Sequence, residues 1–188
     1  MKGIHLDPHR RYRERCAPRE GECGFQIVIG ETDLRVTAVS PLPEGFKDAL
    51  AARVRALRSE LEAWIVLHPE FRHSLVPVPL SCPVPPPEIV RRMAEASAIA
   101  GVGPFAAVAG TIAQMAAESL SDRSPDGALA DALATALCNR LQGPGDVKAV
   151  VDYARRFVKY GLTGIFAQCG GAVGVWGDME LTAVEHNA

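Results

Sequence analysis

Two segments rich in strand-forming residues lie near opposite ends of this 188-residue chain, and the long stretch between them has helical periodicity. Residues 25–29 and 34–39 are apolar runs joined by four residues, which predicts a β-hairpin. Residues 163–168 and 172–176, joined by Cys169-Gly170-Gly171, predict a second hairpin. Because the strands and helices are segregated along the chain, this order predicts an α+β fold with antiparallel sheet rather than a doubly wound parallel sheet.

Apolar residues recur every three or four positions through the middle of the chain, as expected for helices. The predicted helices cover residues 46–68, 88–100 and 105–119, a segment capped by Asp126 that ends near 143, and a segment from 145 to 161. Residues 179–184 could extend the second hairpin. Since a two-stranded hairpin is a poor sheet by itself, either the hairpins pair across the molecule or in a dimer, or central strands are absent from this sequence.

Composition excludes several classes of protein. Hydrophobic residues make up 48% of the chain and charged residues 22%, as in an ordinary globular domain. The net charge of −2 argues against a nucleic-acid binder, which is usually basic. No window is long and apolar enough for a membrane span, and no signal-peptide core begins the chain, so we expect a cytoplasmic protein without a membrane partner. The five scattered cysteines are then most simply free thiols.

Asp131 and Thr135 form the most specific candidate site. On a helix, residues four apart lie one above the other on the same face, and here small residues flank that face. A carboxylate and a hydroxyl so arranged suit a hard cation such as Mg²⁺, which completes its shell with water and phosphate oxygens. The alternative is an amphipathic helix that presents an acid and a threonine to water.

A glycine-rich segment precedes the predicted helix 105–119. Gly101 and Gly103 lie where the backbone enters this helix, and such a backbone can cradle a phosphate. The helix itself is rich in small residues, including Gly110. The alternative is close packing, since the segment matches neither the dinucleotide-binding nor the Walker fingerprint.

Several short motifs carry a resemblance to a known family. They are Glu31-Thr32-Asp33-Leu34, His68-Pro69-Glu70-Phe71 with Pro77, the segment 101–110, the segment from Ala130-Asp131 to Ala136, and Gly174-Val175-Trp176-Gly177-Asp178. In these motifs the chain resembles the uncharacterised sister family of the ApbE-like FAD:protein FMN transferases. The resemblance implies a single ApbE-like domain over residues 1–188, with a T-fold-like, pseudo-duplicated architecture whose halves cover about 20–120 and 125–188.

The same resemblance implies a ligand. Asp131 and Thr135 would be Mg²⁺ ligands, and the residues in contact with FAD or FMN would be Gly101, Gly103, Gly110 and Gln114. Gln114 stands where the enzymes carry a lysine, and their middle strands, with an acidic Asn-Gly-Gly-Asp segment, have no counterpart near Leu120 to Ser124. That segment is either deleted or missing from the chain as given.

Three functions follow from these observations, and the sequence assigns no catalytic residue to any of them. The first is Mg²⁺-dependent transfer of a flavin nucleotide. The second is binding of a flavin or another nucleotide without catalysis. The third is a structural role as a homo-oligomer or partner-binding protein, in which the unpaired hairpin edges join another subunit.

Overall fold

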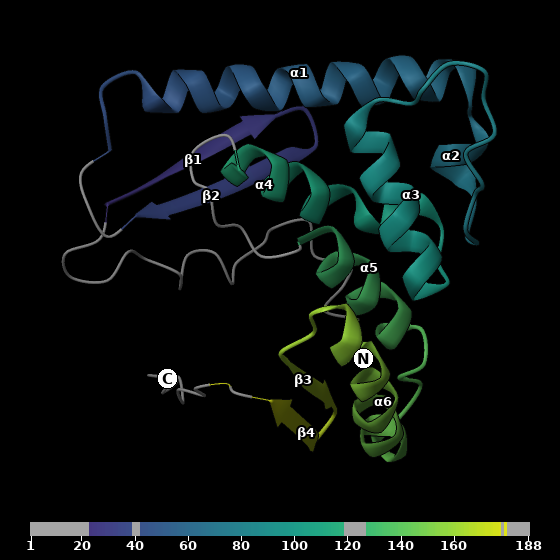
Figure 1. The fold of residues 1–188 in the computed structure, drawn as a ribbon. Coiled ribbons are helices and arrows are strands. Elements are labelled where there is room, and N and C mark those ends of the chain that lie inside the picture. Colours follow the sequence, from purple (N-terminus) through teal and green to yellow (C-terminus); the bar gives the residue numbers. More distant parts are fainter. Residues whose placement is uncertain (1–22, 39–41, 119–126, 178, 180–188) are drawn as a thin grey trace. The chain divides into compact units, whose positions relative to one another are not determined.

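The computed structural model describes residues 23–38, 42–118, 127–177 and 179 (Figure 1). The chain divides into two compact units, Met1–Ala56 and Leu57–Ala188, and the boundary between them lies within helix α1 (Phe46–Leu67). Helices and antiparallel hairpins together make an α+β fold, as the order of elements predicts. The T-fold and the duplicated halves stay predictions.

Both predicted hairpins are present. Strand β1 (Cys23–Ile29) pairs with β2 (Thr32–Ala38), and β3 (Gly164–Cys169) pairs with β4 (Ala172–Gly177). The two connecting turns are shorter than predicted: each has two residues, where four and three were expected. Each turn begins with a glycine at positive φ, 56° for Gly30 and 58° for Gly170. Glycine at this position gives a two-residue turn the twist of the flanking strands. Within the described residues the two hairpins are separate two-stranded sheets.

In the first unit, β1–β2 has one apolar face and one mostly polar face, on which Val28 is exposed. Phe25, on the apolar face, meets Phe46 of α1 edge to face at 6.0 Å between ring centroids. On the opposite face, the Gln26 side-chain amide donates to the Asp33 carboxylate at 2.7 Å. Polar and charged side chains on the outer face favour contact with water over pairing with another sheet.

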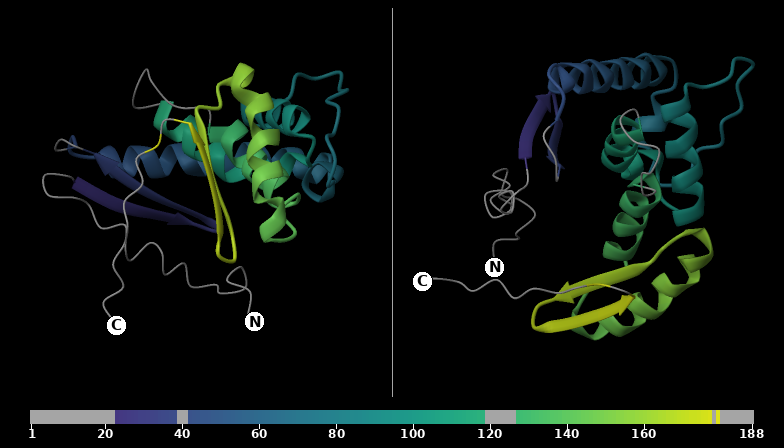
Figure 2. Two further views of the ribbon diagram at one scale, coloured as in Figure 1. Left: turned by 90° about the horizontal axis from the view of Figure 1, so that it is seen from below. Right: turned by 60° about the vertical axis from the view of Figure 1, so that its left-hand side comes forward.

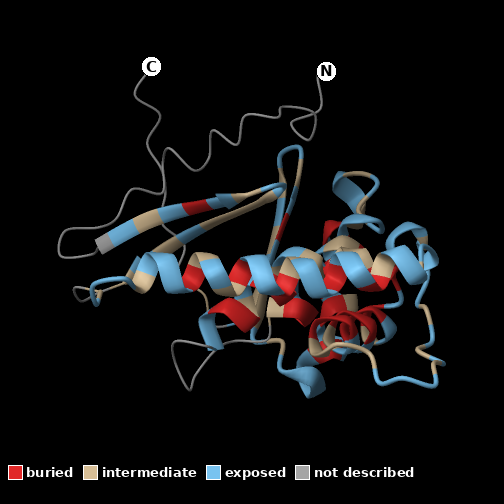
Figure 3. Cartoon of the chain, turned by 90° about the horizontal axis from the view of Figure 1, so that it is seen from above, coloured by how far each residue is buried: buried red, intermediate tan, exposed pale blue. Residues whose placement is uncertain are grey.

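Helix α1 confirms the predicted three- and four-residue spacing. Its buried residues form one stripe, which Figure 3 shows in red beside pale blue exposed residues; they are Leu50, Val54, Leu57, Leu61 and Trp64. The helix ends at Leu67, before the His68-Pro69 step that disfavours helical backbone. The sequence analysis did not predict the four-residue helix α2 (Glu70–His73), which carries the fully buried Phe71.

The turn after helix α3 (Glu88–Ala100) brings two helical segments together at a sharp angle. Gly101 ends α3 with a φ of 73°, and the Ser97 carbonyl accepts the N–H groups of Gly101 and Val102. The chain then enters the 3₁₀-helix η3 (Pro104–Ala107) and helix α4 (Val108–Glu118). In the described part of the chain, no single helix is long and apolar enough to cross a membrane, and α3 with η3–α4 meets that criterion only as a pair bent by 105°.

Helix α5 (Gly127–Cys138) packs against α3, η3 and α4. It ends five residues earlier than predicted, because the N–H groups of Arg140 and Leu141 bond to carbonyls three residues back and tighten the chain into a turn. The predicted cap, Asp126, and the position of the missing family segment, Leu120 to Ser124, lie outside the described residues.

The C-terminal hairpin packs on helix α6 (Val147–Ala154), as Figure 2 shows. Their shared core contains Leu137, Val147, Val150, Val151, Ala154 and Ala167. Two 3₁₀-helices, η4 (Pro144–Asp146) and η5 (Arg155–Tyr160), flank α6, and Gly161 ends the second with a φ of 98°. Of the predicted extension over residues 179–184, all but Met179 lies outside the described residues.

Candidate functional site

Asp131 lies at the crossing of α4 and α5. Its Oδ2 accepts the backbone N–H of Gly110 at 2.9 Å, and the carboxylate also accepts the N–H of Ala109. Both donors lie near the start of α4, just after the 3₁₀-helix η3, which continues into α4 through the bond from the Val108 N–H to the Phe105 carbonyl. The side chain of α5 therefore bonds to the backbone of α4 close to the point where η3 runs into it.

The pKa of Asp131 is raised above its ordinary value. Burial is the largest cause, since it penalises the charged form, and the hydrogen bonds from Gly110 and Ala109 act in the opposite direction. Among the described residues, no cationic side chain contributes to this shift. The result is a half-buried carboxylate whose partners are uncharged backbone groups.

Thr135 lies one helical turn beyond Asp131, as its spacing predicts. Its hydroxyl donates to the backbone carbonyl of Asp131 at 3.3 Å, and the side chain is half-buried. The described residues contain no cluster of three or more His, Cys, Asp or Glu side chains that could hold a metal. Mg²⁺ commonly binds one or two carboxylates and completes its shell with phosphate oxygens and water.

The two helices approach closely at Gly110 and Gly127. A Cβ placed on Gly110 would lie 1.8 Å from the carbonyl oxygen of Gly127 and 2.8 Å from the Cβ of Asp131. Only glycine fits at this crossing. The close approach also brings Asp131 within hydrogen-bond distance of the α4 backbone.

Gln114 lies one turn after Gly110 and is also in contact with α5. Its Oε1 accepts the N–H of Ala128 at 3.2 Å, and its Nε2 donates to Glu118 at 3.0 Å. Arg92 of α3 pairs with Glu118 at 2.7 Å and holds the pKa of that carboxyl below its ordinary value. The structure therefore gives Gln114 a role in capping the start of α5.

The predicted site residues form two groups. Gly110, Gln114 and Asp131 come together where α4 meets α5, and Thr135 lies one turn further along α5. Gly101 and Gly103 instead form the turn after α3. A Cβ on Gly103 would lie 1.8 Å from the carbonyl oxygen of Ser74, so this glycine permits a close backbone contact. The bond between Asp131 and Gly110 was not predicted, although an isolated glycine inside a helix is a signal of close approach.

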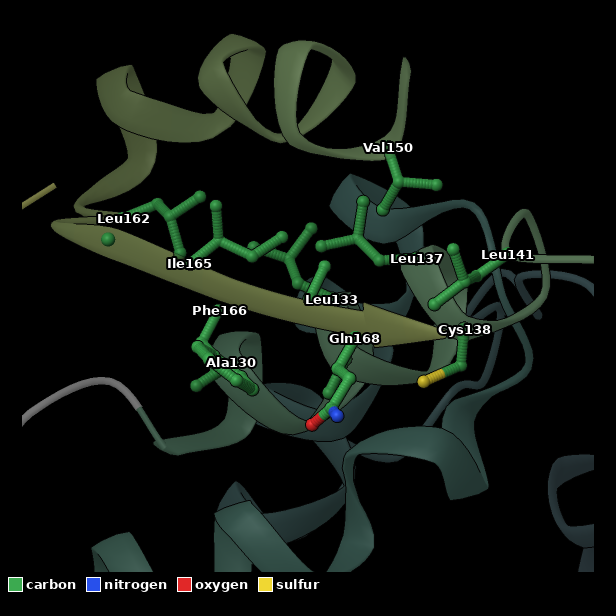
Figure 4. A pocket seen from close by; sticks show the side chains of 13 residues that line it. Ala130, Leu133, Leu137, Cys138, Leu141, Val150, Leu162, Ile165, Phe166 and Gln168 are labelled. Carbon is green, nitrogen blue, oxygen red and sulfur yellow. The ribbon is translucent and has the colours of Figure 1, made fainter. Parts of the chain in front are cut away.

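The sequence analysis also missed a cavity of about 390 Å³ between α5 and the C-terminal hairpin (Figure 4). Ala130, Ala134 and Cys138 line it from α5, and residues 164–168 of β3 line it from the other side. Two features of the sequence could have indicated it: residues 164–177 carry no charge, and small residues recur every four positions in α5.

Comparison with known proteins identifies the family. A family model described as "AbpE bacteria" matches residues 14–126, which is more than half of the chain. The chain belongs to this family. The matched segment includes Gly101, Gly103, Gly110 and Gln114, and it ends before Asp131.

Several archaeal proteins are similar to this member of the family. The UPF0280 protein of Methanocella arvoryzae is 42% identical over 103 residues, 55% of this chain and 40% of the relative. The UPF0280 protein of Archaeoglobus fulgidus is 43% identical over 96 residues, 51% of this chain and 39% of the relative. That of Methanocaldococcus jannaschii is 46% identical over 99 residues, 53% of this chain and 38% of the relative. The chain thus spans about two fifths of the length of the curated relatives it matches.

Proposed function

We propose that this chain binds a flavin nucleotide together with Mg²⁺ at Asp131 and Thr135, and that this site serves a Mg²⁺-dependent transfer of the nucleotide. The observation that carries the proposal is the environment of the Asp131 carboxylate, which is half-buried and hydrogen-bonded to uncharged backbone groups. Burial of a charge that no counter-charge balances is unfavourable. A bound cation would supply that counter-charge, and the resemblance to the flavin transferases names Mg²⁺.

The donor atoms fit Mg²⁺, which binds one or two carboxylates and takes its other ligands from water and phosphate. A carboxylate oxygen has two lone pairs, so Asp131 can accept the Gly110 N–H and still bind a metal. The Thr135 hydroxyl uses its proton on a helix carbonyl, and its lone pairs stay available to a cation. When bound, Mg²⁺ would neutralise negative charge on the phosphate oxygens and so favour cleavage of a pyrophosphate.

Asp131→Asn should remove the metal-dependent part of flavin binding. In calorimetric titrations with FAD, we expect the wild type to bind more tightly at millimolar Mg²⁺ than in EDTA. In the variant, this Mg²⁺-dependent increase in FAD affinity should be at least about tenfold smaller, because a neutral amide is a much weaker ligand for a hard cation than a carboxylate. Equal affinity of the wild type with and without Mg²⁺, or full retention of the gain in the variant, would contradict the proposal.

Stability measurements separate this effect from the structural role of Asp131. The asparagine oxygen can still accept the Gly110 N–H, so urea unfolding of Asp131→Asn should remain close to that of the wild type. Asp131→Ala leaves that N–H without its acceptor and should cost about 1 kcal/mol. The gain from Mg²⁺ should also decline as the pH falls through the raised pKa of Asp131, since the protonated carboxyl no longer binds the cation.

Binding without chemistry is the second candidate. It is favoured by Gln114, an uncharged residue whose amide is engaged by Ala128 and Glu118. Incubation of the protein with FAD, Mg²⁺ and candidate acceptor proteins, followed by mass spectrometry, distinguishes the two. Release of AMP together with FMN-labelled protein indicates transfer, whereas recovery of intact FAD favours a binding protein.

The third candidate, a homo-oligomer, is favoured by the outer face of β3–β4. Phe166, Val173 and Val175 are 48%, 54% and 41% exposed there, and residues 164–177 carry no charge. A group of exposed apolar side chains on one face is typical of a surface that contacts another protein. We expect light scattering to give the mass of two or more chains for the wild type and of one chain for Val173→Lys. The mass of one chain for both proteins would exclude association through this face.

A further inference from the structure

The cavity between α5 and β3 runs along the free edge of the strand rather than over one of its faces. Successive side chains of a strand point to opposite faces, yet five consecutive residues, 164–168, line the cavity. Strand β4 pairs along the other edge of β3, and the described residues provide no third strand in this sheet. Backbone N–H and C=O groups on the free edge therefore face the cavity.

Across the cavity, α5 presents both small and large apolar side chains, since Leu133 and Leu137 line it as well. The small ones, Ala130, Ala134 and Cys138, recur every four residues. Figure 4 shows Ala130 and Cys138 on the same side of β3 as Phe166 and Gln168. The volume of about 390 Å³ lies at the lower end of the range of about 300–1,000 Å³ for small-molecule pockets. It suits one ring system better than a whole dinucleotide.

The chemistry of the lining restricts the occupant. None of the described residues that line the cavity carries a charge, and its polar side chains are the Gln168 amide and the Cys138 thiol. Phosphate or carboxylate groups would lose their hydration here without a counter-charge, so they are disfavoured. A flat, uncharged ring with N–H and C=O groups on its rim can pack between the α5 alanines and Phe166 and pair with the strand edge.

The position of the cavity on α5 connects it with Asp131. Each residue turns a helix by 100°, so Ala130 and Ala134 lie on the face next to the one that carries Asp131 and Thr135. We infer that this cavity binds the ring of a planar, uncharged heteroaromatic group, whose charged substituent then extends toward Asp131. Only the direction of the charged substituent toward Asp131 rests on the proposed function, because binding of the ring itself needs no metal.

Riboflavin tests the inference, since it has a flavin ring and no phosphate. Its fluorescence titration in EDTA should show saturable binding to the wild type and to Asp131→Asn alike. Ala134→Phe should weaken that binding at least tenfold, because the new ring occupies the space between α5 and β3. Ala134 is exposed, so the variant should fold; Ala63→Phe, on an exposed position of α1 that does not line the cavity, is the matched control.

The outcomes separate the two proposals. Absence of riboflavin binding, or equal affinity of Ala134→Phe and the wild type, overturns the ring site even if Mg²⁺-dependent FAD binding is found. Riboflavin binding that Ala134→Phe abolishes supports the ring site even if Mg²⁺ has no effect. The alternative occupant of the cavity is a strand from a second copy of the chain, and light scattering tests it. If the wild type is an oligomer and Ala134→Phe is a single chain, a second copy fills the cavity and the inference is overturned.

Discussion

Gly110→Ala should lower the free energy of unfolding by at least about 3 kcal/mol, the upper end of the usual cost of overpacking a core. The added Cβ would lie 1.8 Å from the carbonyl oxygen of Gly127, a backbone atom that cannot rotate away. Helices α4 and α5 would have to separate, which would also stretch the 2.9 Å hydrogen bond from Gly110 to Asp131. Urea denaturation followed by circular dichroism measures the loss.

Gly145→Ala is the matched control for this substitution. Gly145 lies in η4, and a Cβ at this position would meet no atom within 4 Å. Its unfolding free energy should stay within about 0.5 kcal/mol of the wild type, as is usual for surface changes. If Gly110→Ala were as stable as this control, α4 and α5 would not approach as closely as described. The hydrogen bond from Gly110 to Asp131 would then also be in error.

Phe71→Ala should cost about 3–5 kcal/mol, the usual range for removal of a buried phenylalanine ring. Phe71 is fully buried although it belongs to a helix of only four residues, and α2 packs against η3. Such a short helix cannot be stable by itself, so its position depends on this side chain. Thermal unfolding monitored by circular dichroism should show a large decrease in the melting temperature.

Leu75→Ala, four residues further along, provides the comparison. Leu75 is also a large apolar residue, but it is 89% exposed, so its removal leaves no cavity. We expect little change in the melting temperature for this variant. Similar losses for both variants would mean that the burial of Phe71 contributes nothing specific to stability.

Local patterns were sufficient to predict most elements of the fold. The spacing of apolar residues in α1 and α3 depends only on helix geometry, so their bounds could be predicted within one residue. The C-terminal end of α5 and the lengths of both hairpin turns were predicted less well, because they depend on hydrogen bonds between a few neighbouring backbone groups. Helix α2 was missed, since four residues carry no periodic signal and Phe71 is fixed by its burial.

The sequence by itself determined that Asp131 and Thr135 share one face of a helix, because a spacing of four residues allows no other arrangement on α5. It also determined that a glycine lies inside the predicted helix 105–119. Only the tertiary structure decided that these features meet: Gly110 lets α4 approach α5 closely enough for the Asp131 carboxylate to accept its N–H. The position of the cavity along β3 was likewise decided by packing, because the free edge of a strand and the small side chains of a distant helix become neighbours only when the chain folds.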